Sequence, residues 1–69
     1  MKSMKNITLN GEKHTTDKRI LLELLSELGM TEGRFAVEVD DTLLPKSRLG
    51  EAVIIDGMNV EVVQAVGGG

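Results

Sequence analysis

The stretch Ile7-Thr8-Leu9-Asn10-Gly11 predicts how the fold begins. Its first three residues alternate between apolar and polar, which is the pattern of a strand with one buried face. Asn-Gly follows directly, and it is the strongest short hairpin signal because both residues of a type I′ turn need a positive φ. Residues 12–15 are then the returning strand. Their polar side chains predict an edge position in the sheet, where charge blocks unwanted pairing.

A leucine-rich segment after this hairpin predicts the main helix, at about residues 18–28. Thr16 or Asp17 is the expected N-cap, and Gly29 is the expected residue after the helix end. The apolar residues recur at spacings of one, three and four, so that they form one stripe of a helix: Ile20, Leu21, Leu24, Leu25 and Leu28.

The second half of the chain predicts three further strands. Residues 35–39 alternate, residues 43–44 form a short apolar piece that Pro45 ends, and residues 59–66 form the last strand. Turns are expected at residues 40–42 and at Asp56-Gly57. In addition to the helix stripe, the residues expected to face the core are Ile7, Leu9, Phe35, Val37, Val39, Leu44, Leu49, Val60 and Val62.

These elements predict one α+β domain over residues 1–66, with a mixed sheet of four to five strands packed on the helix. The 69 residues suffice for one small domain. No apolar run approaches the length of a membrane span, and the N-terminus lacks the pattern of a signal peptide. We therefore expect a cytoplasmic protein.

The composition excludes several classes of function. The chain has no cysteine and one histidine, His14, which argues against disulfides, thiol catalysis and a cysteine or histidine-rich metal site. A net charge of -3 and a single aromatic residue argue against a nucleic-acid partner. Asp40 and Asp41 are adjacent and point apart, so they predict a solvated turn. His14 has no recognised nucleophile arrangement nearby, so we expect it to be exposed and uninvolved. The sequence therefore predicts no catalytic residue and no metal site.

Three glycines, Gly67, Gly68 and Gly69, follow the last strand. Their high backbone entropy cannot add stability, so their physical use is access. An extended backbone without Cβ atoms can thread a narrow channel and present a terminal carboxylate about 10 Å from Val66. On composition alone, a frayed terminus or a linker remnant has about equal weight.

Four stretches carry a family resemblance: residues 7–11, the leucine-rich helix, Leu44-Pro45-Lys46-Ser47-Arg48, and residues 56–69 with their closing Gln64-Ala65-Val66-Gly67-Gly68-Gly69. Together they resemble the ThiS family of sulfur carriers of thiamin biosynthesis, which has the ubiquitin-like β-grasp fold. The resemblance covers Lys5 to Gly69. Met58-Asn59 and Asp41-Thr42 depart from the family pattern outside the tail, which leaves partner specificity open.

The resemblance implies a carrier protein rather than an enzyme. A ThiF-type adenylyltransferase would use ATP to adenylate the Gly69 carboxylate, and a sulfur donor protein would help convert it to a thiocarboxylate. A ThiG-type thiazole synthase would then take the sulfur. The tail residues 67–69 would enter the partner's active-site channel. The carrier would bind no cofactor itself and would be a monomer when free, with no nucleic-acid or membrane partner.

In a β-grasp fold the sheet face away from the helix is free, and small apolar residues ringed by charge can form a docking patch there. Glu38, Glu61 and Asp40 are expected to steer a basic partner. A MoaD-like carrier for molybdopterin synthesis and a ubiquitin-like interaction module that is never activated remain the alternatives. The expected docking patch consists of Ala36, Glu38, Val63, Ala65 and Val66.

Overall fold

The structure is a computed structural model, and it describes residues 3–65. Val66 and the glycine tail at residues 67–69 lie outside the described residues. No helix within residues 3–65 is long and apolar enough to cross a membrane.

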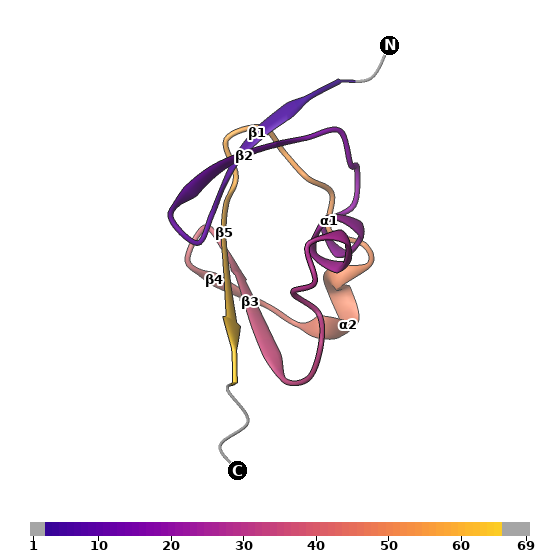
Figure 1. Ribbon diagram of the computed structural model, residues 1–69, viewed down its shortest axis with the longest axis vertical. Coiled ribbons are helices and arrows are strands. Elements are labelled where there is room, and N and C mark those ends of the chain that lie inside the picture. Colours follow the sequence, from indigo (N-terminus) through magenta and orange to yellow (C-terminus); the bar gives the residue numbers. More distant parts are fainter. Residues whose placement is uncertain (1–2, 66–69) are drawn as a thin grey trace.

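One mixed sheet forms the centre of the molecule, with the strand order β2-β1-β5-β3-β4. β1 and β5 are parallel neighbours, and the other pairs are antiparallel. Two helices, α1 (Leu21–Glu27) and α2 (Lys46–Leu49), lie on the same side of this sheet (Figure 1). The expected α+β architecture is confirmed, with five strands: β1 (Lys5–Leu9), β2 (Glu12–Thr16), β3 (Phe35–Val39), β4 (Thr42–Leu44) and β5 (Asn59–Gln64).

The first hairpin forms as predicted. Asn10 and Gly11 have φ values of 51° and 82°, the left-handed backbone that the type I′ turn needs. β2 lies at the edge of the sheet and extends one residue further than expected, because Thr16 pairs with Lys5 and its side chain is buried. Asn10 also joins the hairpin to the centre of the sheet, since its Oδ1 accepts a hydrogen bond from the Val62 N–H at 2.8 Å.

Replacing Asn10 with alanine is expected to destabilise the fold by about 2 kcal/mol. The positive φ costs alanine roughly 1 kcal/mol, and the lost hydrogen bond adds roughly another. Asn10→Gly is the matched control, because glycine tolerates the φ and loses only the hydrogen bond, for a cost of about 1 kcal/mol. Urea denaturation measures both values. Equal losses in the two variants would show that the backbone conformation contributes nothing.

The main helix is shorter than predicted: α1 begins at Leu21, not near residue 18. A long-range contact explains the difference, because Ile20 forms a β-bridge with Val53, and the Leu21 N–H donates to Ala52 O at 2.9 Å. Because Arg19 and Ile20 pair with Ile54 and Val53, this part of the backbone is extended and cannot also be helical. The expected cap is likewise wrong, since Thr16 Oγ1 accepts from the Lys18 N–H at 3.0 Å, outside the helix.

The helix end follows the prediction at Gly29, which has a φ of 74°. The Gly29 N–H donates to Ser26 O at 3.1 Å, and the Met30 N–H donates to Leu25 O at 2.9 Å. These two bonds are the Schellman pattern, which satisfies carbonyls that the helix leaves unpaired. Leu28, expected on the buried stripe, is instead exposed at this helix end.

The core lies between the sheet and the two helices. Leu49 is buried as expected, whereas Phe35, Val39 and Leu44 pack at the margin of the core and are only partly buried. Two residues that the sequence did not assign, Ile54 and Met58, complete the core. The buried apolar residues are Ile7, Leu9, Leu21, Leu24, Leu25, Val37, Leu49, Ile54, Met58, Val60 and Val62.

Candidate functional site

The predicted docking patch lies on the sheet face opposite the helices, which we call the outer face. Ala36 and Val63 are direct partners across β3 and β5, and both are exposed. Their neighbours Val37 and Val62 point to the core, so alternation along each strand places the two sets on opposite faces. The structure therefore brings Ala36, Glu38, Val63 and Ala65 to one face, while Val66 lies outside the described residues.

A shallow apolar depression of about 290 Å³ opens at the end of this face where β5 leads toward residue 66. Phe35, at the start of β3, forms part of its wall. The ammonium group of Lys46 on α2 lies 4.2 Å from the centre of the Phe35 ring. This cation–π contact orients the ring at the rim of the depression. The residues that line it are Arg34, Phe35, Ala36, Val63 and Ala65.

Leu43 extends the apolar surface, and the sequence analysis did not assign it to the patch. Leu43 is on β4, directly opposite Glu38 of β3, and its side chain is 63% exposed. The signal was present, because Leu44 faces the core and the preceding strand residue must then face outward. We call Ala36, Leu43, Val63 and Ala65 the apolar patch.

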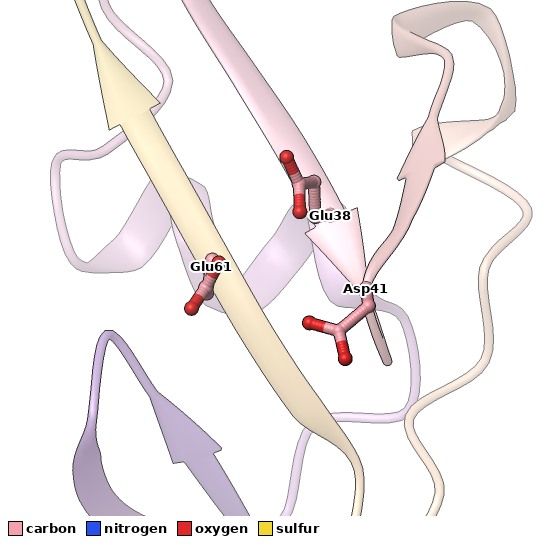
Figure 2. A group of neighbouring side chains, drawn as sticks. All are labelled: Glu38, Asp41 and Glu61. Atoms are coloured by element: carbon pink, nitrogen blue, oxygen red, sulfur yellow. The ribbon is translucent and has the colours of Figure 1, made fainter.

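Three carboxylates gather beside the apolar patch, and we call them the acidic cluster. Glu38 on β3 and Glu61 on β5 are direct cross-strand partners, and Asp41 joins them from the turn after β3 (Figure 2). One carboxylate oxygen from each of the three residues lies within 4.8 Å of those from the other two. Like charges this close repel each other, so a basic side chain placed among them would be stabilised. Exposed acidic groups commonly gather without an ion, so the cluster by itself carries no metal assignment.

Asp40, which was expected to steer a basic partner together with Glu38 and Glu61, is not a member of this cluster, and Asp41 takes that place. Asp40 Oδ1 accepts a hydrogen bond from the Asn59 N–H at 3.0 Å, so this carboxylate fixes the start of β5. Asp40 and Asp41 both have positive φ, and the resulting tight turn sends Asp41 to the outer face instead. The prediction that the two adjacent carboxylates point apart is consistent with their different partners.

His14 is half-buried rather than exposed, since it lies opposite Ile7 and so shares the core-facing side of β2. Lys18 has a shifted pKa, and it belongs to neither the apolar patch nor the acidic cluster. The pKa of Lys18 is raised, chiefly because its ammonium donates a hydrogen bond to the Glu27 carboxylate, with the ion pair at 3.3 Å.

Among the predicted site residues, the structure brings together the described residues of the docking patch and two of the three steering carboxylates, Glu38 and Glu61.

Comparison with known proteins places this geometry in a family. The profile of the ThiS family matches residues 5–69. A crystal structure of the thiamine biosynthesis protein ThiS from Geobacter metallireducens superposes with a TM-score of 0.76 and 31% identity, covering 93% of this chain and 99% of that one. The fold is therefore the ubiquitin-like β-grasp.

Three curated relatives cover more than nine-tenths of this chain. An uncharacterized protein, ycf40, from Pyropia yezoensis is 38% identical over 65 residues, with 93% of this chain and 92% of that one covered. The ycf40 protein of Porphyra purpurea is 35% identical, with the same coverage. A thiazole synthase from Paramagnetospirillum magneticum is 34% identical over 64 residues, which are 91% of this chain but only 20% of that protein.

Members of the ThiS family are small sulfur carriers of thiamin biosynthesis rather than catalysts, in agreement with the family that the sequence resembles. The family profile runs through the β5 strand and on to residue 69. This chain belongs to the ThiS family.

Proposed function

We propose that the carboxylate of Gly69 is the group on which this protein carries sulfur. A ThiF-type adenylyltransferase transfers AMP from ATP to this carboxylate and releases pyrophosphate. Sulfur at the oxidation level of sulfide, supplied through a donor protein, then displaces AMP and leaves a thiocarboxylate. Activation is needed because a carboxylate oxygen is a poor leaving group until it is bound to AMP as a mixed anhydride. The observation that supports this proposal is the ThiS family match, which extends through Gly69.

The acceptor of the sulfur, in this proposal, is a ThiG-type thiazole synthase, which uses it to form the thiazole ring of thiamin. The supporting observation is that the thiazole synthase of Paramagnetospirillum magneticum contains a segment 34% identical to this chain. A carrier and its acceptor in one polypeptide are held at high effective concentration. The separate carrier acts in the cytoplasm, where the activating partner has ATP, and it binds no cofactor of its own.

Thiocarboxylate formation tests this function directly. The chain is incubated with a ThiF-type enzyme, ATP and sulfide, and the C-terminus is examined by mass spectrometry. The replacement of oxygen by sulfur has the same nominal mass as one methionine oxidation, and the chain has four methionines. The product must therefore also be alkylated selectively as a thiocarboxylate. An alkylated product that requires ATP is expected; none with the activating enzyme, or equal amounts without ATP, would refute the proposal.

We further propose that the apolar patch and the acidic cluster form the surface that binds these partners. Val63 is 62% exposed at the centre of the patch, beside the depression and two residues from Glu61. Apolar area surrounded by charge is typical of protein interfaces, and the cluster favours a partner with basic side chains. The surface lies at the end of β5 from which the chain continues into the tail, so a docked partner is positioned to receive it.

Replacing Val63 with serine is expected to weaken binding to the ThiF-type enzyme about tenfold, because burial of the valine side chain is lost. The fold is expected to tolerate this change at an exposed site. Val53→Ser is the matched control, since Val53 is also exposed (42%) but lies beside Ile20 on the other side of the molecule. Calorimetric titration measures both dissociation constants. Equal affinities for the two variants would place the interface elsewhere.

A further inference from the structure

The two edges of β5 are covered to different extents. On one side, β3 pairs with β5 from Val60 to Gln64. On the other side, β1 pairs with β5 only at Asn59 and Val60, since β1 ends at Leu9 and the chain turns away into β2. Figure 1 shows the result: the last half of β5 runs beyond the β1–β2 hairpin with β3 along one side only.

Hydrogen bonds show which backbone groups face the uncovered edge. The Ala65 N–H donates to Arg34 O at 3.0 Å, on the β3 side. Because successive residues of a strand alternate in direction, Val62 and Gln64 turn their backbone groups to the other side. There the Val62 N–H is taken by the side chain of Asn10. Within residues 3–65, no hydrogen bond is formed by the Gln64 N–H, which follows Val62 O along this edge.

The other two sheet edges carry features that discourage pairing. β2 presents polar and charged side chains such as Glu12 and Lys13, and β4 has only three residues before Pro45. Natural sheets use charges, short strands and proline in this way to block edge-to-edge association. The sequence Val62-Val63-Gln64 of β5 has none of these features.

We propose that the open edge of β5, at Val62 O and the Gln64 N–H, is completed by an extended segment of the activating partner, which adds a short strand there. This inference rests on the proposed function, in which that partner receives the chain immediately after β5. Strand addition supplies affinity through main-chain bonds, and alternate side chains supply specificity.

The outer face defines the chemistry of the added strand. The side chains of the added strand that point to the outer face lie next to Glu61 and Val63, which are two residues apart on β5. A strand with a basic residue and an apolar residue at alternate positions therefore fits both. The basic residue is attracted by the three carboxylates of the acidic cluster, and the apolar residue continues the apolar patch.

Replacing Gln64 with proline removes the edge donor while leaving the ladder to β3 intact, because the Gln64 N–H points away from β3. The thermal unfolding midpoint is expected to stay within a few degrees, and the dissociation constant for the ThiF-type enzyme is expected to rise at least about tenfold. Gln64→Ala is the matched control: it keeps the N–H and is expected to bind within about twofold of the unmodified chain. Tight binding by Gln64→Pro would overturn the proposal, as would equal losses in both variants.

A second measurement covers the case in which Gln64→Pro does not fold. Amide hydrogen exchange of the unmodified chain is expected to be fast at Gln64 and slow at Ala65, which is bonded to Arg34. On addition of the enzyme, exchange at Gln64 is expected to slow at least about tenfold. Unchanged exchange at Gln64 in a complex that forms would reject the added strand. Absence of any complex would instead reject the proposed function.

Discussion

Deletion of Gly69 is expected to abolish thiocarboxylate formation while leaving the fold unchanged. The deletion moves the terminal carboxylate back by about 3.5 Å, the length of one extended residue. A displacement of even 1 Å from the reacting position can cost about a hundredfold in rate, so we expect a loss of at least about a thousandfold. Alkylation of the product, followed by mass spectrometry over time, measures the rate.

The fold should be unaffected, because the core lies within residues 7–62 and the last pairing of β5 with β3 is at Gln64. The thermal unfolding midpoint of the shortened chain is therefore expected to equal that of the full chain. Deletion of Ser3, an exposed residue at the other end of the chain, is the control for the loss of one residue. A shortened chain that is modified at the original rate would contradict the role of Gly69, and one that unfolds would contradict a tail that is independent of the domain.

Local signals predicted the elements that local chemistry controls. The Asn10-Gly11 turn and the Gly29 helix end depend on positive φ, which the residue type itself favours, and both formed where expected. Alternation likewise predicted that Val60 and Val62 face the core while Val63 faces outward. A strand with one buried face leaves no other arrangement, because a shift of one residue would expose the whole apolar set.

Long-range contacts account for what the sequence analysis missed. The start of α1 depends on Val53, more than thirty positions from Ile20, and no local pattern indicates that pairing. Ile54, the residue after Val53, is buried by the same long-range pairing, because its N–H donates a hydrogen bond to Arg19 O at 2.8 Å. Composition alone suggests only an apolar run there, with no indication of which side chain is buried.

The candidate site divides in the same way. The apolar patch was predicted by alternation except for Leu43, since Ala36 and Val63 follow directly from the inward positions of their neighbours. The acidic cluster was predicted only in part, because the backbone conformation of the turn decides whether Asp40 or Asp41 reaches Glu61. The open edge of β5 depends on where the parallel strand β1 ends relative to it, and this register is set by packing between distant segments.

Replacement of Leu25 with alanine is expected to destabilise the protein by about 3–5 kcal/mol. Leu25 is fully buried on the face of α1 that packs on the sheet. The substitution loses the burial of the side chain and leaves a cavity that the surrounding aliphatic residues fill only in part. A domain of this size has roughly 4–10 kcal/mol of total stability, so the loss is a large share of it. Urea denaturation measures the change, and a thermal midpoint lowered by well over 10 °C is expected.

Leu22→Ala is the matched control, because it makes the same substitution on the same helix at a site that is 36% exposed. The expected change there is smaller, about 1–2 kcal/mol, since less burial is lost and alanine has the higher helix propensity. The contrast between the two leucines isolates the contribution of the core from that of the helix. Equal losses at both positions would mean that helix formation, rather than packing of α1 on the sheet, limits the stability of this domain. A small loss at Leu25 would mean that the core closes around the missing atoms.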